Sequence, residues 1–264
     1  MIEIEAAPAG YRVPPALLAG RVVLVTGASG TLGGAVAHAA AAAGANVVLH
    51  GRNEKRLTAL YDEIVAAGGP EPAILPLDFA KCGAREFDAV ADTIRRAFAR
   101  LDGIVHCAGH FTPLAPLSSQ PFEAWNAHLA VNLSAPYAVT RACLPLLLEA
   151  PDASVIFVGE SHGLRPAAYW APSAVAKAGL AALTRIWAGE LGTSPTIRVN
   201  LIVPGPVATR QRRVSHPGED PLQLAPAESI APAILYLLGR DASGVTGRAI
   251  ACHAGDMPAG PGIG

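Results

Sequence analysis

The strongest constraint on the fold of this chain is an alternation of short β-branched runs with longer segments rich in Ala and Leu. Such alternation is typical of repeated βαβ units, in which each helix returns the chain to the same edge of a parallel sheet. The runs predicted to be strands are Arg21–Thr26, Ala45–Leu49, Ala73–Leu77, Gly103–His106, Ala153–Val158, Thr196–Val203 and Arg248–Cys252. The segments predicted to be helices are Leu32–Ala43, Glu54–Ala67, Ala84–Arg100, Phe122–Leu148, Ser173–Leu191 and Pro226–Leu238.

These elements predict one doubly wound α/β domain of the Rossmann type. Its seven-stranded parallel sheet is flanked by helices on both faces, with right-handed crossovers. Hydrophobic residues make up 51% of the sequence, which suits a sheet buried on both faces. Residues 1–20 are expected to be an irregular lead-in, residues 21–253 the single domain, and residues 254–264 a flexible tail rich in Gly and Pro.

Net charge and hydropathy argue against several classes of partner. The net charge of −1 gives no electrostatic reason to expect nucleic acid or an acidic membrane. The apolar stretch from Ala35 to Leu49 is interrupted by polar residues and is shorter than the ~20 residues that a membrane span needs. The first ten residues lack the basic cluster of a secretory signal, so we expect a cytoplasmic protein.

The cysteines also point away from a metal site. They lie at Cys82, Cys107, Cys143 and Cys252, without the spacing of metal ligands. We therefore expect reduced thiols and no metal.

A turn with three glycines joins the first predicted strand to the first predicted helix. Glycines at such a junction let the backbone approach a pyrophosphate, whose charge then lies at the helix N-terminus. The turn predicts a dinucleotide site; the alternative is a tight strand-to-helix turn without a ligand. The residues concerned are Gly27, Ser29, Gly30, Thr31, Leu32 and Gly33.

The residues after the second predicted strand bear on the type of dinucleotide. An NAD site usually places a carboxylate here for the ribose 2′-hydroxyl, whereas Arg accommodates a 2′-phosphate. No acidic residue precedes Glu54, and Arg52 is available. This pattern favours NADP(H) over NAD(H), unless Arg52 is simply a solvated surface residue.

Further motifs follow in a fixed order, and with them the chain resembles the short-chain dehydrogenase/reductases, most closely the bacterial YciK-like subgroup. The resemblance runs from the lead-in Pro14–Gly20 to the last predicted strand. Its motifs are Leu77-Asp78, His106-Cys107-Ala108-Gly109, Val131-Asn132-Leu133, Arg198-Val199-Asn200 and Pro204-Gly205-Pro206-Val207-Ala208-Thr209.

The resemblance implies roles in cofactor binding. Asp78 would hydrogen-bond the adenine, and the backbone of Ala108 and Gly109 would line the adenosine pocket. The nicotinamide end would be held by Pro204, Gly205, Val207 and Thr209, with Lys177 on its ribose. Two positions depart from the usual pattern: Cys107 replaces an Asn, and Thr31 stands where many members have Gly.

The catalytic positions implied by the resemblance are altered as well. In this family a Tyr four residues before a Lys transfers the proton, a Ser on the preceding strand end binds the substrate oxygen, and an Asn holds a water relay. Lys177 and Asn132 are present, but Ser173 stands at the Tyr position and Glu160 at the Ser position. An aliphatic hydroxyl is a poor general acid near neutral pH, so the ordinary proton relay is not expected.

Several other residues are candidates to replace the missing groups. Glu160 is either a desolvated carboxyl that acts as acid or base, or a partner that only forms an ion pair with Lys177. Ser161 binds a carbonyl oxygen or bonds to local backbone. Tyr169 supplies a phenol or belongs to the pocket loop, and His162 shuttles protons or forms a pocket wall.

The leading hypothesis is an NADP(H)-dependent oxidoreductase of the short-chain type, with an atypical proton-transfer group and an unknown carbonyl or alcohol substrate. The alternatives are a degenerate cofactor-binding homologue, serving as a sensor or inactive partner, and non-redox chemistry with Glu160 as base. Residues 206–225 are expected to form a substrate lid, whose arginines either attract an anion or are solvated. By the same resemblance we expect a homodimer or homotetramer.

Overall fold

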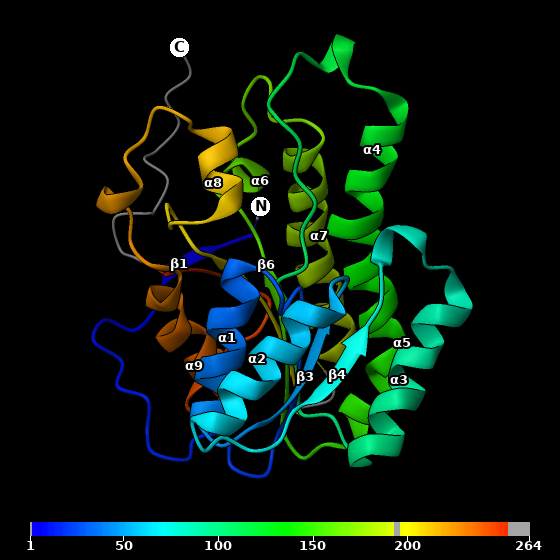
Figure 1. The fold of residues 1–264 in the computed structure, drawn as a ribbon, viewed down its shortest axis with the longest axis vertical. Helices are drawn as coiled ribbons and strands as arrows, with labels where there is room; N and C mark the ends of the chain where they lie inside the picture. The colour runs from blue at the N-terminus through cyan, green and yellow to red at the C-terminus, as the bar shows by residue number, and fades with distance from the viewer. Residues whose placement is uncertain (1, 193–195, 253–264) are drawn as a thin grey trace.

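The computed structural model describes residues 2–192 and 196–252 (Figure 1). Its sheet has eight strands, all parallel, in the order β1-β8-β7-β6-β5-β2-β3-β4. The strands are β1 (Ile4–Ala6), β2 (Val22–Thr26), β3 (Asn46–Gly51), β4 (Ala73–Pro76), β5 (Gly103–His106), β6 (Ala153–Val158), β7 (Ile197–Val203) and β8 (Ala249–Ala251). The predicted doubly wound α/β fold is therefore confirmed.

Helices cover both faces of the sheet. One face carries α1, α2 and α9, and the other carries α3, α5 and α7, each group with its own apolar core. The helix bounds are α1 (Thr31–Ala42), α2 (Glu54–Ala66), α3 (Ala84–Phe98), α4 (Phe122–Leu129), α5 (Ala135–Glu149), α6 (Ser161–Leu164), α7 (Ser173–Leu191), α8 (Arg210–Ser215) and α9 (Ala231–Leu238). Within the described ranges no helix has the length and apolar character needed to cross a membrane.

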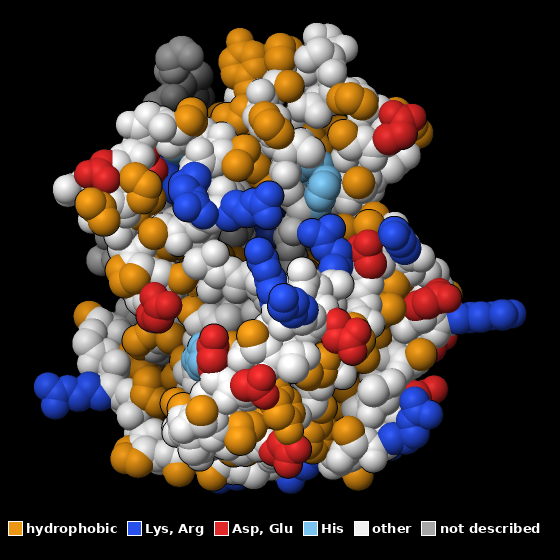
Figure 2. Space-filling view, viewed as in Figure 1, with side chains coloured by type: hydrophobic (Ala, Val, Ile, Leu, Met, Phe, Trp, Pro, Cys, Tyr) orange, Lys and Arg blue, Asp and Glu red, His pale blue; other side chains and the backbone are white. Residues whose placement is uncertain are grey.

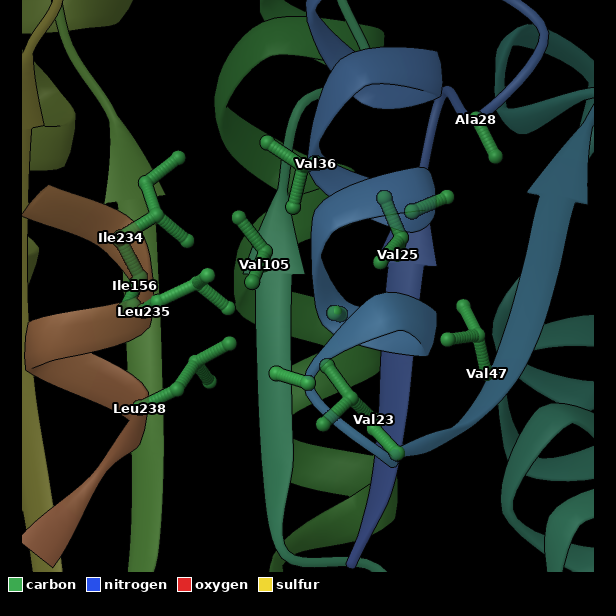
Figure 3. Close-up of a cluster of buried hydrophobic side chains, with 14 of the residues drawn as sticks. Val23, Val25, Ala28, Val36, Val47, Val105, Ile156, Ile234, Leu235 and Leu238 are labelled. Carbon is green, nitrogen blue, oxygen red and sulfur yellow. The ribbon is translucent and has the colours of Figure 1, made fainter. Parts of the chain in front are cut away.

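The central strands are apolar because both of their faces are buried. All five residues of β2 are buried, and so are all six of β6. Figure 3 shows part of the core on one face of the sheet. Val23 and Val25 of β2 and Val105 of β5 belong to the same cluster as Ile234 and Leu238 of α9. Runs of β-branched residues without polar alternation are typical of such doubly covered parallel strands.

Two sequence predictions about the fold are wrong in part. The sheet has eight strands rather than seven, because Ile4–Ala6 pairs with Ala249–Ala251 at its edge. Residues 1–20 are therefore not irregular throughout. The segment 206–225, for which no helix was predicted, contains the helix α8. The predicted tail, residues 254–264, lies outside the described residues.

The predicted long helix Phe122–Leu148 is interrupted. A π-helical turn, Ala130–Ser134, separates α4 from α5 and contains Asn132. The last predicted helix is also shorter than expected: α9 begins at Ala231, after a 3₁₀ turn over Ala227–Ile230.

The sheet order fixes where a ligand can bind. From β2 the chain moves outward through β3 and β4, then returns to place β5 on the other side of β2. In open α/β sheets this reversal opens a crevice at the carboxyl ends of the strands. Every predicted cofactor-binding residue up to Gly109 follows β2, β3, β4 or β5 at that edge.

Candidate active site

The turn after β2 has no room for side chains at two of its glycines. Gly27 has a φ of +67°, and a Cβ there would lie 2.6 Å from the Cα of Ala108. A Cβ on Gly33 would lie 2.2 Å from the carbonyl oxygen of Gly27. The turn is therefore packed tightly against both the loop after β5 and its own helix.

The start of α1 is open to a ligand. Its N-cap residue, Gly30, has no side chain to bond the first amides of the helix, and both Gly30 and Thr31 are exposed. The first N–H groups of a helix lack partners within the helix and carry partial positive charge, so they suit a phosphate. The cradle shaped by the glycines and these amides fits a dinucleotide pyrophosphate.

The residues predicted for the adenosine end follow the neighbouring strands. Arg52 is exposed directly after β3, and Asp78 is the N-cap of a 3₁₀ turn after β4, where its Oδ1 accepts a hydrogen bond from the Ala80 amide. The amide of Ala108 donates to the Thr26 hydroxyl at 3.1 Å, which ties the loop after β5 to β2.

One cavity of about 350 Å³ lies at the carboxyl ends of β5, β6 and β7. It brings together residues predicted to bind cofactor and residues predicted to be catalytic: Leu32, Gly109, Glu160, Ser161, Lys177, Pro204, Gly205, Val207 and Thr209. Figure 2 shows Lys and Arg side chains gathered on this face between α8 and the beginnings of α1 and α2. Asn132 and Ser173 do not line the cavity.

Lys177 lies on α7 and is buried, with 9% of its surface exposed. Its Nζ donates a hydrogen bond of 2.6 Å to the carbonyl of Val158 at the end of β6. Burial lowers the pKa of Lys177, although the charges of Glu160 and Cys107 act in the opposite direction. The absence of a side chain at Gly163 allows this close packing, since a Cβ there would lie 2.5 Å from the Cβ of Lys177.

Glu160 follows β6 and directs its carboxyl into the cavity, where two donors hold it. Ser173 donates its hydroxyl proton to Oε2 at 3.2 Å, and Gln211 of α8 donates from Nε2 to Oε1 at 3.4 Å. Burial raises the pKa of Glu160, and the opposing effects of Lys177, Ser173 and Arg212 are smaller. The charges of Glu160 and Lys177 interact, but no direct ion pair joins these two described residues.

Ser173 is buried next to Glu160 and does not line the cavity. Only 3% of its surface is exposed, and its hydroxyl bonds to the Glu160 carboxyl. Asn132 is similarly occupied, because its Oδ1 accepts from the amide of His110 and its Nδ2 donates to the carbonyl of the same residue, both at 2.8 Å. The side chains of both residues therefore act on neighbouring protein groups.

The cavity lining includes large or polar side chains that were not predicted as site residues from the sequence, among them Trp170, Gln211 and Arg212. Trp170 stacks on His162 with ring centroids 3.6 Å apart, which makes the histidine part of the cavity wall. Arg212 pairs with Glu219 through two contacts of 2.6 and 2.7 Å. In the sequence, only the clustered arginines of the lid pointed to Arg212.

The candidate phenol Tyr169 is 59% exposed and does not line the cavity.

The cysteines and potential metal ligands complete the chemistry of the site. Cys107 lines the cavity, and burial raises the pKa of its thiol to about 12, so it is not a ready nucleophile. Across the part of the chain that the structure describes, no group of three or more His, Cys, Asp or Glu side chains is arranged to hold a metal ion.

Comparison with known proteins identifies the family. Residues 21–220 match the family described as short chain dehydrogenase. The Escherichia coli K12 protein YciK, described as an uncharacterized oxidoreductase, is 34% identical over 248 residues, which cover 94% of this chain and 98% of YciK.

Solved structures agree with this match. One from Pseudomonas syringae, named as a short chain dehydrogenase, is 39% identical, covers 92% of this chain and 98% of its own, and superposes with a TM-score of 0.90. Another, a short chain dehydrogenase from Shigella flexneri 2a complexed with NADP, is 33% identical, covers 90% and 99% of the two chains, and has a TM-score of 0.88. The chain therefore belongs to the short-chain dehydrogenase family.

Proposed function

We propose that this protein is an NADP(H)-dependent oxidoreductase that interconverts a carbonyl and an alcohol and uses an atypical proton-transfer group. The observation that carries the proposal is the shared cavity. It joins the residues that the resemblance assigns to the nicotinamide, Pro204 to Thr209, with the ionisable pair Glu160 and Lys177. A hydride acceptor placed in that cavity would contact both the cofactor and the carboxyl group.

The proposed cofactor rests on three features. The glycine turn and the uncapped start of α1 form a cradle for a pyrophosphate. Arg52 is exposed at the end of β3, where a 2′-phosphate would be recognised. The similar structure from Shigella flexneri contains NADP. When bound, the reduced cofactor supplies the hydride, while the protein supplies position and protonation.

Glu160 is the proposed proton-transfer group. Glu160 lines the cavity, whereas Ser173, at the position where the family has Tyr, does not line it and donates its hydroxyl proton to the Glu160 carboxyl. In reduction, the protonated carboxyl donates its proton to the substrate oxygen as hydride reaches the carbon. In oxidation, the carboxylate accepts that proton. Its raised pKa keeps the protonated form available at higher pH than for an exposed carboxyl.

A second candidate is a protein that binds the cofactor without turnover. Two contacts favour it: the Ser173 hydroxyl is bonded to the Glu160 carboxyl, and Lys177 is bonded to the Val158 carbonyl. Under this alternative the cofactor groove would be functional and the catalytic end inactive.

Fluorescence titration with NADPH and NADH, followed by assays of carbonyl reduction over a substrate panel, separates these possibilities. We expect NADPH to bind more tightly than NADH and at least one carbonyl to be reduced. Binding without any turnover would support the second candidate, and failure to bind either nucleotide would contradict both.

Glu160→Gln then tests the proton-transfer group. In the wild type, reduction should fall as the pH rises through the pKa of Glu160, because only the protonated carboxyl can donate. The variant should lose about 100-fold in reduction rate, together with that pH dependence, and keep its affinity for NADPH. An unchanged rate and pH profile would remove Glu160 from the mechanism.

We also propose a lid and an oligomer. Residues 206–225 form the substrate lid, since Gln211 and Arg212 of α8 border the cavity.

The chain assembles as a homodimer or homotetramer through α5 and α7, which expose the apolar side chains of Tyr137, Leu148 and Ile186. Light scattering during gel filtration measures the assembly.

A further inference from the structure

We propose that His50 and Gly51, at the end of β3, form a platform that holds the phosphate-binding turn in its binding conformation, with His50 as a positioning residue for the cofactor. This inference rests on the proposed binding of NADP(H). It concerns residues that would not themselves touch the phosphates, since both are buried beneath the turn.

His50 bonds to two successive amides of the turn. Its ring atom Nδ1 accepts from the Gly27 amide at 3.3 Å, and its backbone carbonyl accepts from the Ala28 amide at 2.8 Å. The second contact requires only a backbone at position 50, whereas the first requires an acceptor at the δ position of the side chain. The side chain therefore adds a restraint that most residues would not supply.

The restrained residue, Gly27, is a glycine in the left-handed region of backbone conformation. Glycine populates positive and negative φ about equally, so the conformation of Gly27, with a φ of +67°, needs outside support. The turn must also hold Gly27 within contact of Ala108 and of Gly33, where no Cβ would fit. A hydrogen bond to the Gly27 amide selects this conformation before the ligand arrives, which lowers the entropic cost of binding.

The His50 ring is itself fixed. It is 2% exposed and stacks on Phe79 with ring centroids 3.9 Å apart and planes at 15°. Accepting from Gly27 requires an unprotonated Nδ1, so the ring proton lies on Nε2. Burial lowers the pKa of His50 to about 4, and the ring therefore stays neutral, with Nδ1 free to accept, near neutral pH.

Gly51 supports the turn through the space that it leaves. A Cβ at Gly51 would lie 2.7 Å from the hydroxyl oxygen of Ser29, so the Ser29 side chain occupies the place of a side chain at position 51. The turn thus contacts the end of β3 at Gly27, Ala28 and Ser29. The Ser29 side chain therefore packs against Gly51 of β3 and helps to hold the turn in place.

Substitution of His50 by Leu and by Asn tests the inference. Leu removes the acceptor, whereas the Oδ1 of Asn can replace Nδ1. We expect His50→Leu to raise the dissociation constant for NADPH at least about tenfold and to speed amide hydrogen exchange at Gly27 in the ligand-free protein. His50→Asn should bind NADPH within about threefold of wild type and keep the Gly27 amide protected.

A control and a second variant keep the test decisive. His128→Leu changes another buried histidine, on α4, and should alter stability without altering exchange at Gly27. If His50→Leu does not fold, Gly51→Ala takes its place, and we expect the displaced Ser29 side chain to weaken NADPH binding by a similar factor.

The failing outcomes are distinct. Unchanged NADPH affinity in His50→Leu, or equal losses in the Leu and Asn variants, would overturn the platform. Wild-type protein that does not bind NADPH would overturn the proposed function instead, while the exchange rate of the Gly27 amide would still test the platform itself.

Discussion

The cleft at the carboxyl edge of the sheet has two ends that use the chain differently. The proposed dinucleotide end is formed mainly by backbone: the uncapped amides of α1 and the glycines of the turn after β2. At the proposed catalytic end, the contacts come from side chains, chiefly Glu160, Lys177 and Ser173. Binding at the dinucleotide end depends on the shape of the backbone turn, whereas catalysis at the other end depends on the pKa of one side chain.

Under the proposed function, this difference explains how the dinucleotide end can follow the family's pattern while the catalytic end departs from it. A phosphate cradle made by N–H groups tolerates many side chains, provided that the glycines without room for a Cβ are kept. Proton transfer has no such tolerance, because it depends on a single group of suitable pKa at one place. The proposed function therefore requires a different proton-transfer group at Glu160, but no change in the cofactor groove.

The largest effect is expected from Gly33→Ala at the backbone end. The new Cβ would meet the Gly27 carbonyl oxygen at 2.2 Å, so the turn must move. We expect NADPH affinity to fall by more than about 100-fold and the free energy of unfolding by about 1–3 kcal/mol. The neighbouring Gly34→Ala is the control, because its Cβ would lie at an ordinary 3.4 Å from the Ala28 oxygen. Equal losses of affinity in the two variants would break the comparison.

A double substitution at the catalytic end should produce the next largest effect. Ser173→Tyr combined with Glu160→Ser would place the family's Tyr and Ser at their usual positions, four residues before Lys177 and after β6, and would remove the Glu160 carboxyl. We expect the double variant to reduce panel carbonyls at least about tenfold faster than either single variant, with NADPH affinity nearly unchanged. Slower turnover in the double variant than in Glu160→Ser alone would show that the site cannot accept the phenol.

Arg52→Gln should affect the two nucleotides unequally. Loss of a charged donor to the 2′-phosphate should weaken NADPH binding by about tenfold and leave NADH binding nearly unchanged. Parallel titrations with the two nucleotides measure this. Equal weakening of both would mean that Arg52 acts on the fold or on the shared diphosphate.

The smallest effect is expected from Tyr169→Phe. Because Tyr169 is exposed and outside the cavity, removal of its hydroxyl should change the reduction rate by less than about twofold. Steady-state rates at several pH values check this. A large loss would make a loop phenol the acid in place of Glu160.

Much of the fold was predictable because its strands are continuous apolar runs. The seven strands from β2 to β8 coincide with predicted ones within a few residues. The strand β1 was missed because its three residues, Ile4–Ala6, are too few to show a pattern and none is fully buried; pairing with β8 defines it. The helix α8 was missed because Arg-rich residues give no apolar stripe; Thr209 caps it by accepting from the Arg212 amide at 3.1 Å.

The site was predictable by position and less so by orientation. The resemblance to the family placed Glu160, Lys177 and the segment 204–209 at one edge, and the structure puts them around one cavity. It did not reveal that Ser173 bonds to Glu160 or that Asn132 bonds to His110, because rotamers depend on neighbours far along the chain. Trp170 was not predicted because it lies in a loop, and loop residues follow no periodicity.

The pairing of β1 with β8 constrains the order in which the sheet is assembled. These strands come from opposite ends of the chain, with Ile4 beside Ala249 and Ala6 beside Ala251. Among the strands that the structure describes, β1 neighbours only β8, so it cannot pair until β8 has been synthesised. Contacts so distant in sequence are entropically costly to close early, so this edge should form last and open first when the protein is stressed.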